Sequence, residues 1–271
     1  MSLKLTGELN QQFIVDNRPG AGGVVGLEVL IKSPPDGYTI MISTSSWSTA
    51  AALYKPAFDP VTDIAPIAEI GYSPLTLSLH PSVPAKTPQQ LIALARAKPG
   101  DLAYATPGAG AITHLAMELM IHMAKINLLS VPYKSTGLAM TDLIAGRTNL
   151  IMGGLVPLQP FIQSGKLRAI AVTTARRWPS LPDVAAMAEA LPGYEVESWY
   201  GVIAPKGVPP AVLDRLNAAV NRVLREPEMK KNLEGDGMAI VGGSVEQFNK
   251  RIRTEHARWV RLVRDAKLKG E

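Results

Sequence analysis

The chain has 271 residues, of which 46% are hydrophobic and 19% are charged, with a formal net charge of +5 and no cysteine. This length allows a full hydrophobic core and two domains, and the lack of cysteine excludes disulfides, thiol catalysis and zinc sites built from cysteine. No apolar run is long enough to span a bilayer, and the basic residues are scattered outside the last predicted helix. We therefore expect neither membrane insertion nor nucleic-acid binding.

The first part of the chain already alternates helix and strand patterns. Leu5, Leu9 and their polar neighbours read as the last turns of a helix that leads into a strand over 13–15. Because an α/β domain seldom begins inside a helix, we expect that a strand and its loop have been lost upstream, together with any signal peptide. The elements predicted next are a helix over 22–31, a strand over 38–42, a helix toward Leu53, and two antiparallel strands over 65–70 and 75–79.

Two capping signals mark the starts of later helices. Thr87-Pro88-Gln89-Gln90 combines a cap, a proline at the first helical position and a reciprocal glutamine, and Ser244-Val245-Glu246-Gln247 is a capping box. The other predicted elements are strands near 102–105, 128–131, 150, 167–172, 196–204 and 238–241, and helices from about residues 111, 135, 210 and 226. This alternation predicts a largely parallel sheet covered by helices, with ligands at the carboxyl ends of its strands.

The most informative loop lies between the predicted strand over 101–105 and the following helix. Its candidate ligand-binding residues are Thr106, Gly108, Ala109, Gly110, Thr113 and His114. Glycines let backbone N–H groups approach a ligand closely, and the helix N-terminus adds partial positive charge. We therefore predict a cradle for an anion. His114 has a plainer alternative, because a lone histidine in the first turns of a helix is more often a surface or packing residue.

A second polar loop, over 43–47, ends another predicted strand. The hydroxyls of Thr44, Ser45 and Ser46 can donate to a carboxylate, and Trp47 can form a wall against an apolar part of the ligand. An ordinary serine-rich helix cap explains these residues equally well. We include all four residues in the predicted site.

Two more loops occupy corresponding positions after strands. Lys134 and Ser135 offer a cation and a hydroxyl, and Gly153 and Gly154 offer bare backbone. Four such loops at four strand ends would be an unusual coincidence for inert turns. We expect these residues to line the ligand site as well.

The known catalytic patterns are missing. Gly20-Ala21-Gly22 and Gly108-Ala109-Gly110 lack the third glycine of a dinucleotide-binding fingerprint, and the sequence contains neither a phosphate-binding loop nor a nucleophile elbow. The four histidines, His80, His114, His122 and His256, show no zinc motif. We predict no catalytic residue, no cofactor and no metal.

Several longer motifs resemble one family. They are Val15-Asp-Asn-Arg-Pro-Gly-Ala-Gly-Gly23, Pro35-Asp-Gly-Tyr-Thr39, Val131-Pro-Tyr-Lys134, Gly165-Lys-Leu-Arg-Ala169, Leu181-Pro-Asp-Val184, Leu191-Pro-Gly-Tyr194, Ser198-Trp199 and Ala204-Pro205. In this order they resemble the Bug/TctC-like solute receptors of tripartite tricarboxylate transporters, from about Gln11 to the C-terminus.

The resemblance implies a two-domain periplasmic binding protein of type II-like α/β fold, with mixed, mostly parallel sheets flanked by helices and a ligand cleft between the domains. It also implies a periplasmic location, a small di- or tricarboxylate or related organic acid as ligand, and a membrane permease as partner. From the order of elements we expect the chain to cross between domains near Ala103 and Tyr200. Domain one would then be residues 1–103 plus 201–271, and domain two residues 104–200.

The sequence departs from the family pattern in two places. Family members usually begin with a strand and a Pro-Pro-Gly-Gly-type loop, which are absent here, so we expect this chain to bind its ligand weakly or not at all. The family also often carries Asp or Asn where this chain has Gly153-Gly154. Without that side chain to hold an amino or hydroxyl group, we expect an unadorned carboxylate rather than an amino acid.

Two alternative functions are weighed against the receptor. An enzyme acting on a small carboxylate or phosphate ester would use His114 as base and Ser45 or Thr113 as its partner. The effector domain of a transcription regulator would need a DNA-binding helix pair, and no such pattern occurs before Gln11.

Overall fold

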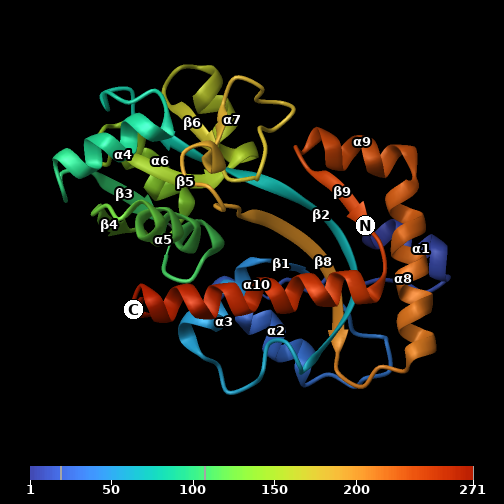
Figure 1. Cartoon of the computed structure of the whole chain (residues 1–271). Coiled ribbons are helices and arrows are strands. Elements are labelled where there is room, and N and C mark those ends of the chain that lie inside the picture. The colour runs from blue at the N-terminus through green and yellow to red at the C-terminus, as the bar shows by residue number, and fades with distance from the viewer. Residues whose placement is uncertain (19, 107, 271) are drawn as a thin grey trace. The chain divides into compact units, whose positions relative to one another are not determined.

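The computed structural model describes residues 1–18, 20–106 and 108–270, and the chain in these ranges forms two compact units. Unit 1 comprises Met1–Tyr72 and Trp199–Gly270, and unit 2 comprises Ser73–Ser198. The chain passes from one unit to the other twice, within the strands β2 (Ile64–Leu79) and β8 (Glu197–Pro205) (Figure 1). Both crossings therefore lie inside strands rather than in loops.

The first crossing lies elsewhere than the sequence predicts. It falls between Tyr72 and Ser73, well before the expected position near Ala103, whereas the second falls close to Tyr200. The difference arises because β2 is one continuous strand of 16 residues where the sequence predicts two antiparallel strands.

Gly71 accounts for this difference, because a glycine between two apolar runs resembles a turn. The structure shows a different reason for a glycine at position 71. A Cβ at Gly71 would lie 2.3 Å from the backbone oxygen of Ala239, at the start of β9 (Ala239–Gly242). Glycine thus allows β9 to approach and pair antiparallel with β2, with Gly71 opposite Ile240.

Unit 1 combines antiparallel strand pairs with helices. β1 (Met41–Thr44) pairs antiparallel with β8, so the expected mostly parallel sheet does not describe this unit's pairs. Helix α10 (Val245–Asp265) runs alongside α3 (Ser46–Tyr54) (Figure 1). The other helices of unit 1 are α1 (Ser2–Leu9), a 3-10 turn (Ala21–Gly23), α2 (Val24–Ile31), α8 (Pro210–Arg225) and α9 (Pro227–Gly235).

The predicted strand over 13–15 is wrong, because these residues adopt no strand structure. Ile14 and Val15 are 85% and 65% exposed, so their apolar side chains are not buried as the strand interpretation requires. Pro19, which belongs to the family motif after this segment, lies outside the described residues.

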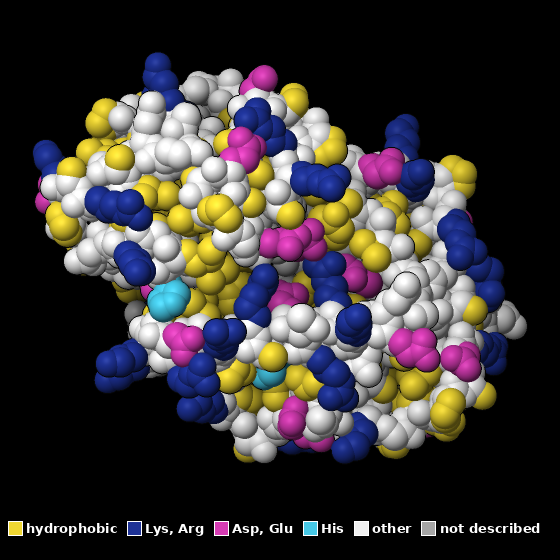
Figure 2. Space-filling model, in the orientation of Figure 1, with side chains coloured by type: hydrophobic (Ala, Val, Ile, Leu, Met, Phe, Trp, Pro, Cys, Tyr) yellow, Lys and Arg dark blue, Asp and Glu magenta, His cyan; other side chains and the backbone are white. Residues whose placement is uncertain are grey.

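Helix α10 begins at the predicted capping box and buries a stripe of apolar side chains along one side. Ser244 Oγ accepts the N–H of Gln247 at 3.2 Å, and Gln247 Oε1 accepts the N–H of Ser244 at 2.9 Å. The stripe residues Phe248, Ile252, Trp259 and Val263 are buried. Lys250, Arg253, Arg261 and Arg264 are exposed, and Figure 2 shows basic side chains over the course of this helix.

Unit 2 contains a mixed sheet in the strand order β4-β3-β5-β2-β6-β7. Strands β3 (Ala103–Thr106), β4 (Leu129–Pro132) and β5 (Leu150–Gly154) are parallel, as predicted for this part of the chain. β2 is antiparallel to both β5 and β6 (Arg168–Val172), and β6 pairs parallel with the short β7 (Ala185–Ala186).

Helices cover both faces of the unit 2 sheet (Figure 1). On one face, α6 (Thr136–Ile144) and α7 (Leu155–Gln163) pack against Ala105 and Ile151. On the other, α5 (Ile112–Ala124) meets Tyr104, whose side chain alternates with that of Ala105 along the strand. α4 (Pro88–Ala97) begins at Thr87, whose Oγ1 accepts the N–H of Gln90 at 3.2 Å, as its capping signal predicts.

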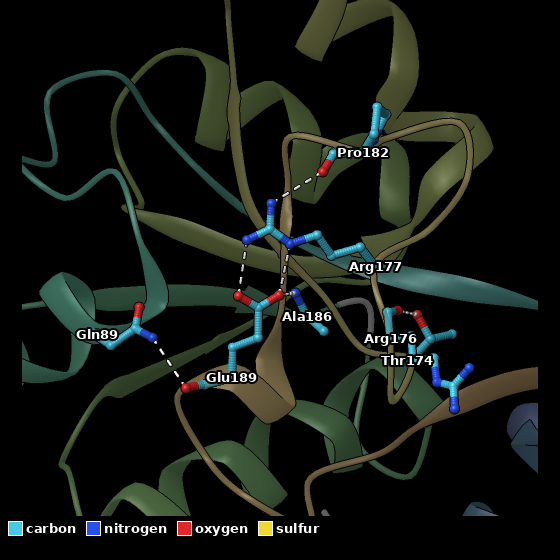
Figure 3. A network of polar contacts seen from close by, with 7 residues as sticks. All are labelled: Gln89, Thr174, Arg176, Arg177, Pro182, Ala186 and Glu189. Carbon is cyan, nitrogen blue, oxygen red and sulfur yellow. Dashed lines mark hydrogen bonds and ion pairs between the residues drawn. The ribbon is translucent and has the colours of Figure 1, made fainter.

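An ion pair between Arg177 and Glu189 holds the segment after β6 (Figure 3). Glu189 lies in the 3-10 turn Met187–Glu189. The two side chains form two hydrogen bonds, of 2.8 and 2.9 Å, and the N–H of Ala186 adds a third to the carboxylate at 2.9 Å. These donors, the guanidinium first, lower the pKa of Glu189 to about 2. Thr174 is fixed locally, because its Oγ1 donates to the backbone oxygen of Arg176 at 2.8 Å.

Among the described residues, no helix has both the length and the apolar character needed to cross a membrane.

Candidate ligand-binding site

Three of the four predicted loops begin at the same edge of the unit 2 sheet. Thr106 at the end of β3 is the register partner of Pro132 at the end of β4, and Ala105 is the partner of Ile151 in β5. Because the three strands are parallel, their carboxyl ends and the loops that follow share one edge. The predicted site residues in unit 2 thus have a common location.

The loop after β3 has the shape that its glycines predict. Gly108 and Gly110 have φ angles of +123° and +81°, which side chains other than that of glycine rarely allow. Gly108 is half-buried, and a Cβ there would meet no atom within 4 Å apart from its chain neighbours, so the space beside its Cα is open. Thr106 is buried, and its Oγ1 donates to the backbone oxygen of Gly108 at 3.5 Å. Pro107 lies outside the described residues.

The N-terminus of α5 supplies backbone donors at this loop. Its cap residue, Ala111, provides no side-chain hydrogen bond, and the first bond within the helix runs from the N–H of Leu115 to the oxygen of Ala111. The N–H groups of Ile112 and Thr113, which precede this bond, point out of the N-terminal end of the helix. Thr113 Oγ1 is buried and has no hydrogen-bond partner among the described residues. Together these groups form a cluster of neutral donors with partial positive charge.

His114 is turned toward its own loop and helix. Its Nδ1 accepts the N–H of Gly110 at 3.4 Å, and its Nε2 lies 3.8 Å from Glu118 Oε1. The same Glu118 oxygen accepts a 2.5 Å hydrogen bond from Tyr104 Oη. Burial, followed by the nearby Glu118 charge, raises the pKa of Tyr104, which keeps its hydroxyl protonated. Gly110, expected to donate its N–H to a ligand, donates it to His114 instead.

The loop after β4 offers exposed groups. Lys134 and Ser135 are both exposed, and Ser135 Oγ accepts the N–H of Leu138 at 3.3 Å as the cap of α6. The ordinary capping role thus accounts for one lone pair of this hydroxyl, while its proton is available for donation.

The two glycines after β5 differ in their surroundings. Gly153 is buried, and a Cβ there would lie 2.8 Å from Leu158 Cδ1. Gly154 is half-buried and precedes α7, whose N-terminus has no side-chain cap. A Cβ at Gly154 would meet Pro157 at 3.5 Å, an ordinary contact distance. This edge of the unit 2 sheet thus carries a second helix N-terminus without a side-chain cap, that of α7, next to the two glycines.

The fourth predicted loop belongs to unit 1. Thr44 ends β1 and is half-buried, as is Ser46, while Ser45 is fully buried at the start of α3. Ser45 Oγ has no hydrogen-bond partner among the described residues, although its N–H donates to the oxygen of Trp199 at 3.0 Å.

Trp47, expected to form a wall of the ligand site, is fully buried in the core of unit 1. Its ring packs edge-on against Trp199, with ring centroids 6.0 Å apart. Trp199 also donates a hydrogen bond from its Nε1 to the Glu255 carboxylate. The other oxygen of Glu255 accepts a hydrogen bond from Trp259 Nε1 at 3.0 Å. The position of Trp47 is therefore explained by packing.

Sequence reasoning missed two buried threonines at the unit 2 edge. Thr76 in β2 is opposite both Gly153 in β5 and Val172 in β6, so β6 also ends at this edge. Thr173, which follows the last residue of β6, accepts the N–H of Leu75 with its Oγ1 at 2.9 Å. A signal was present in the sequence, because Thr173-Thr174 follows a predicted strand in the same way as the other polar loops.

The described residues contain no group of three or more His, Asp or Glu side chains placed to hold a metal ion. The site's chemistry is that of neutral N–H and hydroxyl donors, together with the exposed Lys134.

Residues 1–268 match the model of the tripartite tricarboxylate transporter family receptor. Three solved structures are similar over almost the whole chain. Rpa4515 from R. palustris, solved with adipate, is 34% identical over 100% of this chain and 91% of its own, with a TM-score of 0.87. The periplasmic binding protein BugD is 30% identical over 100% and 92% of the two chains, with a TM-score of 0.84. MatC from Rhodopseudomonas palustris, solved with malate, is 27% identical over 97% and 91%, with a TM-score of 0.83. The chain thus has the fold of two-domain periplasmic binding proteins and belongs to the tripartite tricarboxylate transporter receptor family.

Proposed function

We propose that this protein is a periplasmic receptor that captures a small carboxylate and delivers it to the membrane permease of a tripartite transporter. The observation that carries the proposal is the edge of the unit 2 sheet, where the uncapped N-termini of α5 and α7 lie beside glycine-rich loops. Helix N-termini and bare backbone N–H groups bind anions without a cationic side chain. Adipate and malate in two similar proteins support a carboxylate as the anion.

The proposed ligand contacts in unit 2 divide into three groups. The first consists of Thr106, Gly108, Ala109, Thr113 and the first-turn N–H groups of α5. Lys134 and Ser135 form the second group, and Gly153 and Gly154 the third. Neutral donors in the first and third groups suit reversible capture, because release does not require breaking a buried ion pair.

The loop of Thr44, Ser45 and Ser46 in unit 1 is proposed as a further source of ligand contacts. Its support is the buried Ser45 Oγ, which lacks a partner among the described residues and precedes a helix without a side-chain cap. A buried hydroxyl without a hydrogen bond is costly, and a ligand oxygen would satisfy it.

The ligand is proposed to be a carboxylic acid without an amino group. An ammonium group buried in a protein needs hydrogen-bond acceptors. Gly153 and Gly154 can offer only their backbone carbonyl oxygens, whereas an Asp or Asn would add a side-chain oxygen. The structure leaves room for one at Gly154 and none at Gly153, which makes the first of these positions the place to test ligand preference.

A binding function is favoured over the enzyme alternative by Thr113. A nucleophilic hydroxyl needs a base within hydrogen-bond reach, whereas Thr113 Oγ1 has no partner among the described residues. His114, the candidate base, instead directs Nδ1 to Gly110.

Native mass spectrometry and calorimetry with adipate, malate, citrate and aspartate test the proposal. A receptor retains one unmodified carboxylate per chain, with aspartate bound more weakly than adipate or malate. Conversion of any of these compounds would favour the enzyme, and absence of binding to all of them would contradict the proposed ligand class.

A further inference from the structure

We propose that His114 is a positioning residue that fixes the glycine turn at Gly110 through its Nδ1 and is itself held by Glu118 and Tyr104. The proposal rests on the function proposed for the loop after β3. It differs from direct ligand binding by His114, because the effect on the ligand passes through the backbone of the turn.

The first step is the bond between the turn and the ring. The N–H of Gly110 donates to His114 Nδ1 at 3.4 Å, and His114 is only 9% exposed. A ring nitrogen accepts a hydrogen bond only when it carries no proton, so this contact requires the neutral ring with its proton on Nε2. The ring's protonation state is thus part of the turn's structure.

The second step is the support of the ring. Nε2 faces Glu118 Oε1 at 3.8 Å, one helical turn further along α5. That oxygen also accepts the short hydrogen bond from Tyr104, which is 1% exposed in β3. A proton on Nε2 is favoured by the carboxylate that it faces, and the tyrosine keeps the carboxylate in place.

These contacts form a continuous chain between the strand and the glycine turn. They run from Tyr104 to Glu118, then to His114, and then to Gly110. Tyr104 lies in β3, and Gly110 lies in the loop into which β3 leads. The contacts therefore close a ring that ties the loop back to the strand from which it leaves, and fix its end against α5.

The turn needs such a tie because of its composition. Gly108 and Gly110 both have positive φ angles, and glycine loses more conformational freedom on ordering than any other residue. A Cβ at Gly108 would meet nothing within 4 Å apart from its chain neighbours, so no side chain packs against that side of the residue. A turn ordered before the ligand arrives lowers the cost of binding, which is the advantage that His114 provides.

Two variants of nearly equal shape separate this role from simple packing. In His114→Asn, Oδ1 takes the place of Nδ1 as acceptor, whereas His114→Leu has a similar shape and no acceptor. The control is His122→Leu, which removes an exposed histidine from the same helix. The measurements are hydrogen exchange of the Gly110 amide without ligand, the ring tautomer from nitrogen chemical shifts, and the Kd for adipate.

We expect the Leu variant to weaken the protection of the Gly110 amide and to bind adipate about tenfold more weakly, the loss expected for a hydrogen bond worth about 1.4 kcal/mol. The Asn variant should restore most of both quantities, and His122→Leu should match the native protein. The native ring should carry its proton on Nε2.

Unchanged protection of Gly110 in the Leu variant, equal losses in the Asn and Leu variants, or a native proton on Nδ1 would each overturn the proposal. If the Leu variant does not fold, the native tautomer and the Asn variant still decide. Exchange and tautomer are measured without ligand, so a protein that binds no carboxylate would contradict the proposed function while leaving the test of His114 intact.

Discussion

Gly153 lies against Leu158 so closely that a Cβ on the glycine would stand 2.8 Å from Leu158 Cδ1. Leu158 is fully buried and packs α7 onto the unit 2 sheet. Its neighbour Gly154 has ordinary space and a φ of −59°, which any residue adopts. Two adjacent glycines thus have different roles. Packing against Leu158 requires glycine at position 153, whereas position 154 has room for a side chain at the edge of the proposed site.

This difference predicts effects of different size on the free energy of unfolding. Gly153→Ala should lower the free energy of unfolding by about 1–3 kcal/mol, because the extra methyl overpacks the contact with Leu158. Gly154→Ala should change it by less than about 0.5 kcal/mol. Urea unfolding of both variants measures the difference, and equal effects would show that Leu158 moves aside without cost.

Gly154 also provides a test of ligand preference. Gly154→Asp should weaken adipate binding by about tenfold through repulsion between carboxylates, and should raise the affinity for aspartate relative to adipate. Gly154→Asn is the uncharged control and should weaken adipate less. Calorimetry with both ligands measures the ratio. If the Asp variant kept the native preference, Gly154 would not face the ligand.

Neutral donors predict a weak dependence of binding on salt. Raising the salt from about 20 mM to about 200 mM should weaken adipate binding less than about threefold, and Lys134→Met should have a similarly small effect. The exposure of Lys134 is the reason, since the charge of an exposed lysine is screened by solvent. A steep loss with salt that disappears in Lys134→Met would show that the lysine holds the anion.

His256 predicts a pH dependence of stability in unit 1. Its Nδ1 lies 3.3 Å from Ser48 Oγ and 3.2 Å from the Ser48 backbone oxygen, and burial lowers its pKa. The resulting stability is present above the unfolded pKa of about 6.5 and is lost as pH falls through the lower folded pKa.

Glu255 acts in the opposite direction, because burial raises its pKa. Its contribution is present at low pH and is lost as pH rises through the folded pKa. Comparison of His256→Gln with the native protein therefore isolates the histidine. The variant should lose less stability than the native protein between about pH 7.5 and 5.5, as thermal melts would show. Parallel losses would mean that His256 charges freely in the folded state.

The features predicted from the sequence are those with local causes. Thr87 and Ser244 mark their helix starts because a capping hydroxyl needs only residues within one turn. The polar loops of unit 2 were found in the same way, since each begins where a strand pattern ends.

The features that sequence reasoning missed depend on residues far apart in the chain. The sequence predicts two strands on either side of Gly71 in place of the continuous β2, because the cause of this glycine, the approach of Ala239, lies in a distant strand. The burial of Trp47 against Trp199 and the link from Tyr104 through Glu118 to His114 likewise arise only when strands and helices pack. Tertiary packing of this kind leaves no periodic signal in the sequence.

We propose that a carboxylate binds at the edge of the unit 2 sheet to backbone donors of the loop after β3 and of α5. The most direct test follows the backbone amide signals of the isotope-labelled protein by NMR as adipate is added. We expect saturable shifts that are largest at Gly108, Ile112, Thr113 and Gly154. Saturable binding of adipate that leaves these four amides unmoved would contradict it.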